Sequence, residues 1–173
     1  MNLYPLILRV LHIGSAVFWA GASWSLAGFL SPAVREVQNG GPAVMKYIIR
    51  QRRLSDFLGI SALLTVGSGL LLYWRQFPGL NSGWLTSGPG ISLTIGSVAG
   101  LIAFVLGFFV NRPLTKEIGE IGNQLEASRG PPDPALVQRM GQLQDRLEQA
   151  GIWISILLAI AVVTMASAEQ AVF

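Results

Sequence analysis

The chain has one histidine, His12, and it lies inside an apolar run that extends from residue 3 to residue 30. An ionisable side chain within such a run is a functional candidate, because a polar group is costly to keep in a membrane. A neutral imidazole can ligate haem iron, a chlorin magnesium or a copper ion through one nitrogen. A structural hydrogen bond and proton transfer are the alternatives for this side chain.

Two further residues share a helical stripe with His12. At about 100° per residue, Arg9 and Trp19 fall on the same side of a helix as His12. Arg9 can pair with a carboxylate or propionate, or extend toward the outer membrane surface. We therefore take His12, Arg9 and Trp19 as candidate cofactor-binding residues. Met165 falls in the same half of the membrane and is a candidate second, soft metal ligand beside His12, with packing as its alternative.

Several kinds of chemistry are excluded by the composition. The chain has no cysteine, so disulfides, thiolate metal sites and iron–sulfur clusters are excluded. A single histidine excludes a bis-histidine haem within one chain. Since no acidic residue lies well inside an apolar segment, a carboxylate proton relay is disfavoured. No nucleophile–base pair or phosphate-binding glycine loop is present, and the net charge of +3 does not indicate a nucleic-acid partner.

These side chains must be positioned by membrane helices. The chain is 51% hydrophobic and 12% charged, where soluble domains carry about 25% charged residues. Four apolar segments approach the roughly 20 residues that cross a bilayer, and each must be helical because lipid cannot pair with backbone groups. The predicted spans are 3–30, 56–74, 91–110 and 151–167. The sequence predicts an all-α fold, a four-transmembrane-helix bundle forming a single integral membrane domain over residues 1–173.

The basic residues predict the orientation. Ten of the twelve Lys and Arg residues lie in the links between spans one and two and between spans three and four. The positive-inside rule makes these links cytoplasmic and places both termini outside, in the inner (plasma) membrane of a bacterial-type cell. His12 and Arg9 then lie in the outer half of the membrane.

The second cytoplasmic link predicts an antiparallel helical hairpin over about residues 112–150. Leucine, isoleucine and methionine recur there at four- and three-residue spacing on both sides of a proline-rich turn. Asp133 is a good N-cap and Pro134 a good first helical residue. Helices three and four should therefore extend beyond the membrane. In the first link, residues 43–54 predict an amphipathic helix on the inner membrane surface, or a basic topogenic loop.

Stripes of small residues predict close helix packing. Gly14, Gly21 and Gly28 line the face of the first helix opposite His12, and Gly96, Gly100 and Gly107 line the third. The first helix has a polar face with His12 and a glycine face, and a monomeric bundle buries only one broad face of each helix. We therefore expect this helix to contact something outside its own bundle. The expected partners are the lipid bilayer and a homo-oligomer or larger membrane complex.

Short motifs resemble those of a known group of membrane proteins. Leu11-His12-Ile13, Phe18-Trp19-Ala20-Gly21, Arg52-Arg53-Leu54 and Gly83-Trp84 are similar to segments of small four-helix bacterial proteins. That group comprises the copper-resistance D-like family, the J-type protoporphyrinogen oxidases and uncharacterised relatives, which this chain resembles most. The oxidases imply haem or porphyrin chemistry at the histidine and a lysine near the start of the third helix, where residues 84–89 here contain none. The copper family implies metal transport.

The sequence thus favours an accessory or assembly subunit of a membrane complex, holding haem, another tetrapyrrole or a metal at His12. The predicted function is thus a non-catalytic one. An enzyme of haem biosynthesis resembling protoporphyrinogen oxidase is the alternative, and a copper transport or resistance protein is the third interpretation.

Overall fold

The computed structural model describes residues 3–37, 40–76, 82–128 and 130–170, and within these ranges it is helical without any strand. Four of its helices are long and apolar enough to cross a membrane, which confirms the all-α, four-span prediction. In chain order the elements are α1 (Leu3–Ser25), the π-helical turn η1 (Leu26–Leu30), α2 (Ser31–Glu36), α3 (Gly41–Arg50), α4 (Leu54–Gln76), α5 (Ser82–Leu85), α6 (Gly88–Leu106), the π-helical turn η2 (Gly107–Asn111), α7 (Arg112–Ala127), α8 (Pro134–Ala166) and the 3₁₀ turn η3 (Ala168–Gln170).

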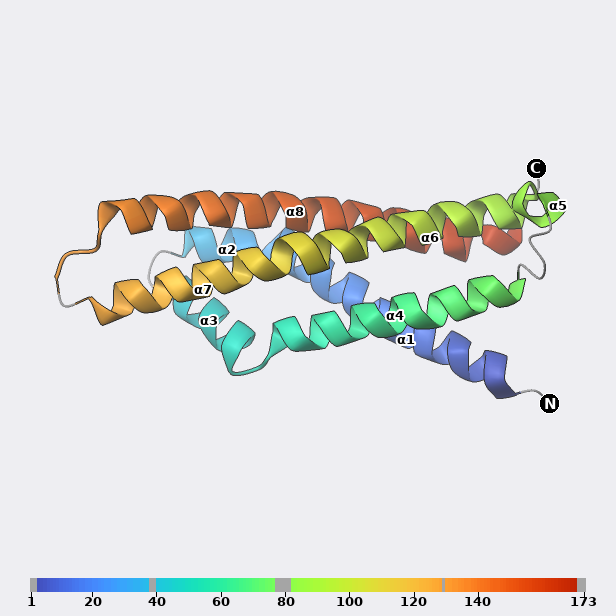
Figure 1. Ribbon diagram of the computed structural model, residues 1–173, viewed down its shortest axis with the longest axis horizontal. Coiled ribbons are helices and arrows are strands. Elements are labelled where there is room, and N and C mark those ends of the chain that lie inside the picture. The colour runs from blue at the N-terminus through green and yellow to red at the C-terminus, as the bar shows by residue number, and fades with distance from the viewer. Residues whose placement is uncertain (1–2, 38–39, 77–81, 129, 171–173) are drawn as a thin grey trace.

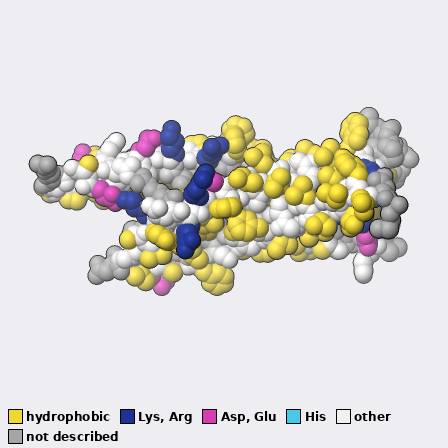
Figure 2. Space-filling model, turned by 90° about the horizontal axis from the view of Figure 1, so that it is seen from below, with side chains coloured by type: hydrophobic (Ala, Val, Ile, Leu, Met, Phe, Trp, Pro, Cys, Tyr) yellow, Lys and Arg dark blue, Asp and Glu magenta, His cyan; other side chains and the backbone are white. Residues whose placement is uncertain are grey.

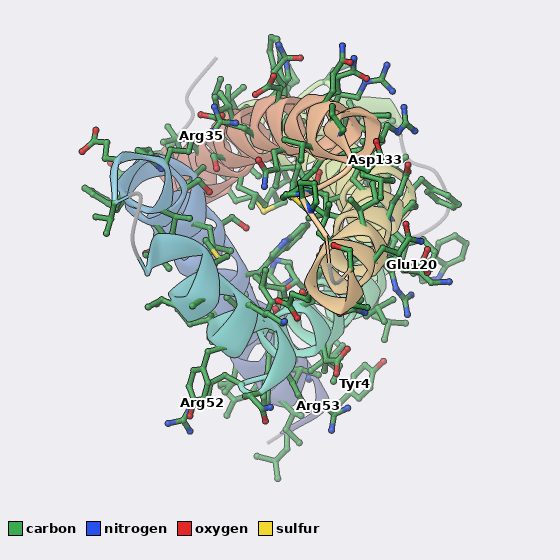
Figure 3. All side chains as sticks on the ribbon, turned by 90° about the vertical axis from the view of Figure 1, so that its left-hand side faces the viewer. Tyr4, Arg35, Arg52, Arg53, Glu120 and Asp133 are labelled. Atoms are coloured by element: carbon green, nitrogen blue, oxygen red, sulfur yellow. The ribbon has the colours of Figure 1, made fainter. Side chains whose placement is uncertain are left out.

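The spans form two antiparallel pairs, α1 with α4 and α6 with α8 (Figures 1 and 3). Small residues let the helices approach in the centre, where Ala20, Ala62 and Ala103 are buried beside Trp19 and Leu158. The start of α1 and the end of α8 lie at the same end of the molecule as α5 (Figure 1). The two pairs contact each other less extensively than the helices within each pair do, and this leaves room between them.

Two π-helical turns interrupt long helices at comparable places. Each turn, η1 and η2, directly precedes a helix whose second residue is proline, Pro32 in α2 and Pro113 in α7. Proline has no N–H to donate to the preceding turn, and its ring clashes with the carbonyl four residues earlier. A local widening of the helix accommodates both effects. The helices therefore continue through these prolines.

α7 packs along the first half of α8, and we call these two arms the hairpin (Figure 1). Ile121 and Leu143 are buried between the two arms, and Arg139 on α8 donates to Glu117 on α7 with an Nε–Oε1 distance of 3.0 Å. Asp133 caps α8 by accepting a hydrogen bond from the Ala135 backbone N–H at 2.9 Å, and Pro134 opens the helix. α7 and the first half of α8 thus form a capped, ion-paired helical pair.

The link between α1 and α4 docks on this hairpin through ion pairs. Arg35 on α2 lies 3.0 Å from Asp145 and 2.6 Å from Glu148, both on α8. Lys46 on α3 lies 2.5 Å from Glu126 on α7. Residues 41–50 are helical, as predicted for part of 43–54. The first link is thus held against the hairpin at one end of the bundle.

The surface divides along the long axis. Hydrophobic side chains cover the end that carries α5, and Lys and Arg gather where this covering gives way to the hairpin end (Figure 2). Arg52, whose guanidinium lies 5.8 Å from the centre of the Tyr47 ring, points away from the bundle (Figure 3). Many large apolar side chains in the long helices are exposed, such as Val17 at 68% and Val163 at 65%. This distribution is compatible with helices surrounded by lipid.

Candidate functional site

His12 is held by α4 rather than by its own helix. Its Nδ1 lies 2.8 Å from the backbone carbonyl oxygen of Thr65. A carbonyl only accepts hydrogen bonds, so Nδ1 carries the proton and donates. Nε2 of the neutral ring then keeps its lone pair, and it has no hydrogen-bond partner within the described residues. This arrangement fixes the tautomer in the way that metal-ligating histidines are commonly fixed.

Gly69 admits the imidazole between α1 and α4. A Cβ atom at Gly69 would lie 2.8 Å from His12 Cε1 and 3.0 Å from Nδ1, closer than side chains tolerate. The ring therefore packs directly on the α4 backbone, one turn beyond Thr65. Sequence reasoning missed Gly69, since only the pairing of α1 with α4 shows which glycine faces His12.

Hydroxyl groups of α4 line the same contact with α1. Ser61, Thr65 and Ser68 donate to the carbonyls of Leu58, Ser61 and Leu64 of their own helix. Thr65 Oγ1 also lies 2.8 Å from Ser15 Oγ on α1. The contact between Thr65 and Ser15 links α4 to α1, whereas the other three hydrogen bonds lie within α4.

A cavity with a volume of about 90 Å³ lies between all four long helices. His12 and Trp19 line it from α1, and Met165 lines it from α8, so the structure brings these three predicted site residues together. Arg9 does not line it and is exposed. Among the contributions of α4 and α6, Gly100 was predicted from the sequence, for helix packing and not for a ligand. These contributions are Thr65, Val66, Gly69, Leu70, Tyr73, Ser97, Gly100 and Leu101.

An aromatic and hydroxyl cluster lies beside the cavity, where Tyr73 of the lining contacts α5 and α6. Tyr73 Oη on α4 lies 2.7 Å from Thr94 Oγ1 on α6, and Thr94 donates to the Gly90 carbonyl at 2.7 Å. The Trp84 ring of α5 packs edge-on against Tyr73, with the ring centres 5.5 Å apart. These contacts link α4, α5 and α6 across that end of the bundle.

Some side chains that line the cavity are also partly exposed on the outside of the bundle. Leu70 is 52% exposed, Leu101 37% and Val162 43%, although all three line it. Each of these residues lies within a helix that can cross a membrane. In a bilayer, these exposed side chains would face lipid. From the exposure of Leu70 and Leu101 we infer an opening between α4 and α6 and call it the lateral window.

The glycines predicted to mediate packing behave in two ways. Gly96 packs closely on α8, since a Cβ there would lie 2.7 Å from Met165 Cγ and 3.2 Å from the Ala161 carbonyl oxygen. A Cβ at Gly14, Gly21 or Gly28 would meet no atom of the described residues within 4 Å. The same holds for Gly100 and Gly107. We call Gly14 and Gly21 of α1 and Gly28 of η1 the open glycine face; no other described helix packs closely on these glycines.

The cavity can be compared with the cofactors expected at His12. A cavity of about 150 Å³ accepts one benzene ring, so 90 Å³ is too small to enclose a macrocycle of four pyrrole rings. A metal ion fits by size, but within the described residues no three His, Cys, Asp or Glu side chains come close enough to hold one. The donors available to an ion would be His12 Nε2 and the Met165 thioether, a pair suited to a soft ion such as Cu(I).

Family models, curated proteins and solved structures were all compared with this chain, and none of them matches it.

Proposed function

We propose that this protein is a non-catalytic, membrane-embedded accessory subunit that binds a ligand at His12 Nε2. One observation carries the proposal: the Thr65 carbonyl accepts a hydrogen bond from Nδ1 at 2.8 Å, which leaves Nε2 without a partner on a ring that lines the cavity between four apolar helices. His12 is half-buried and its Nε2 stays accessible, since the buried side-chain atom without a partner in the described residues is Asn111 Oδ1. A ligand that coordinates or donates to Nε2 would supply the partner that the described residues do not provide.

The open glycine face supports the subunit part of the proposal. A glycine in a helix is about 0.5–1 kcal/mol less favourable than alanine. In Gly96 this cost is offset by close contact with α8, whereas Gly14, Gly21 and Gly28 receive no such contact from the described helices. We infer that a transmembrane helix of a partner, or of a second copy, lies along α1 on this side.

The test is to purify the protein in mild detergent through a tag without histidine and to compare it with His12→Phe. We expect a bound ligand that depends on His12, together with a co-purifying membrane complex. A Soret absorption band that is lost in His12→Phe would identify the ligand as a tetrapyrrole. A stoichiometric metal, detected by elemental analysis and lost in His12→Phe, would identify the ligand as a metal. Turnover of protoporphyrinogen by the pure protein would overturn the non-catalytic assignment.

A matched control separates the site from the fold. Ser15→Ala removes a hydroxyl that bonds Thr65 Oγ1 on the same helix pair, but Ser15 does not line the cavity. Ser15→Ala should keep the ligand. Equal ligand content in the wild type, Ser15→Ala and His12→Phe would contradict binding at Nε2.

A further inference from the structure

We propose that the His12 cavity takes the hydroxyl head of a neutral, lipid-soluble phenol, a class that includes hydroquinones, and that this ligand enters from the bilayer through the lateral window. The inference rests on the proposed function, because it names the chemical class of the ligand bound at Nε2. It follows from the chemistry of Nε2, the direction in which the cavity opens and the size of the cavity.

The tautomer of His12 determines what Nε2 can recognise. With Nδ1 donating to the Thr65 carbonyl, Nε2 is an acceptor and its partner must be a Lewis acid or a hydrogen-bond donor. Quinones, ketones and ethers only accept hydrogen bonds at their oxygens, so they cannot bond to it. A hydroxyl group can, and a phenol is a stronger donor than an aliphatic alcohol.

The lining of the cavity favours a neutral ligand. The residues that line it include no Asp, Glu, Lys or Arg, and most of them are apolar. A charged group would lose its hydration without gaining a counter-charge, a cost of several kcal/mol or more. The Trp19 and Tyr73 rings lie in the lining and offer aromatic surfaces to a planar ring.

The lateral window indicates the access route. The end of the cavity near α5 is linked across by the Tyr73–Thr94 hydrogen bond and the Tyr73–Trp84 ring contact. Leu70 and Leu101, in contrast, are 52% and 37% exposed within apolar helices long enough to cross a membrane. A ligand dissolved in the bilayer meets the window directly, whereas a water-soluble ligand must pass the aromatic cluster.

The size of the cavity distinguishes a phenol from a tetrapyrrole. The reacting iron of a tetrapyrrole lies at the centre of its ring system, so the macrocycle would have to enter before iron reached Nε2. A phenolic hydroxyl is at the edge of its molecule. It can reach Nε2 while 90 Å³ holds only that edge and the rest of the ring occupies the window.

The probe is para-decylphenol, with its methyl ether, para-decylanisole, as the matched ligand that lacks the donor. Equilibrium binding of both is measured on the full chain in lipid nanodiscs, beside decanol. We expect the phenol to bind about tenfold more tightly than the ether, the loss of one hydrogen bond to an otherwise unpaired acceptor. His12→Phe should abolish this difference. Tighter binding of decanol than of the phenol would assign the site to aliphatic alcohols and overturn the aromatic class.

A second pair of variants tests the window without touching His12. Leu101→Trp fills the window, and Ile102→Trp places the same ring on a neighbouring side chain that is 45% exposed and does not line the cavity. Leu101→Trp should slow the association of para-decylphenol at least tenfold and Ile102→Trp should not. Equal affinities of phenol and ether for the wild type would overturn the inference. If the protein then holds a metal that is lost in His12→Phe, the proposed function stands without the phenol. If no ligand depends on His12, the phenol inference and the proposed function are both contradicted.

Discussion

His12 and Thr65 join α1 to α4 through a hydrogen bond that also fixes the proton of the imidazole. The Nδ1–O distance is 2.8 Å, and the acceptor is a backbone carbonyl, so substitution of the Thr65 side chain does not remove it. A carbonyl in a helix is already oriented along the helix axis and costs little to hold in place. The protein thus positions its one histidine with main-chain atoms of the neighbouring helix.

Gly69→Ala should displace the His12 ring. The added methyl group would lie 2.8 Å from Cε1, and neither helix can yield without disturbing the α1–α4 contact. We expect the free energy of unfolding to fall by about 1–3 kcal/mol, as for other overpacked sites, with loss of the ligand. Thermal unfolding in detergent, followed by circular dichroism, measures the change.

Gly67→Ala is the matched control, since a Cβ at Gly67 on the same helix meets no described atom within 4 Å. It should raise stability by about 0.5 kcal/mol through helix propensity. If both variants behave alike, the contact between Gly69 and His12 is not what limits the site.

The open glycine face should matter for assembly and not for the stability of the single chain. Gly21→Leu adds a side chain where the described helices leave space, so the isolated protein should unfold at an unchanged temperature. The complex or oligomer should be lost in size-exclusion chromatography of mild-detergent extracts. In Gly96→Leu the isolated chain itself should be destabilised, because the new side chain would meet Met165 and Thr164. An unchanged complex with Gly21→Leu would remove the support for a partner on this face.

The ion pairs between the first link and the hairpin should be weak and sensitive to salt. Arg35 is 47% exposed at its side chain and Glu148 is 29% exposed, so screening by solvent limits the contribution of their contact. A double-mutant cycle of Arg35→Met and Glu148→Gln should give a coupling of less than about 1 kcal/mol at low salt. At about 1 M salt the coupling should vanish. A coupling that persists at high salt would show that the pair is shielded by something other than these helices.

The Tyr73–Thr94 hydrogen bond should restrict water access to the cavity. The chain has no cysteine, so a single Ser97→Cys variant places one thiol in the cavity lining. A charged, membrane-impermeant thiol reagent should modify it slowly, and adding Tyr73→Phe should raise the rate about tenfold. Mass spectrometry of the intact protein reports the modification. Rapid labelling without Tyr73→Phe would contradict closure at this end.

The sequence predicted well those features that depend on local pattern. The apolar runs indicated the four spans, and Asp133 with Pro134 indicated the start of α8, because each depends on neighbours in the chain. The π-helical turns could not be derived, since proline predicts a disturbed helix but not how the helix adapts. Basic residues pointed to cytoplasmic links, and their contact with the hairpin depended on acidic residues more than 70 positions away.

The site was predictable in part for the same reason. His12, Trp19 and Met165 were identified by residue type and position in the span, and the structure places all three around one cavity. Thr65 O, Gly69 and the Tyr73–Thr94 pair were not, because no pattern within one helix shows which face of the next helix it meets. Arg9 shares the helical stripe of His12 but lies outside the cavity lining.

The state of the His12 ring tests the central claim most directly. The chain has one histidine, so protein labelled with ¹⁵N-histidine and purified without a histidine tag gives a single pair of imidazole nitrogen signals. We predict the neutral tautomer with the proton on Nδ1, and a shift of the Nε2 signal when the ligand binds, while the Nδ1 signal stays nearly unchanged. A proton on Nε2 in the free protein, or an Nε2 signal that no ligand moves, would contradict the account.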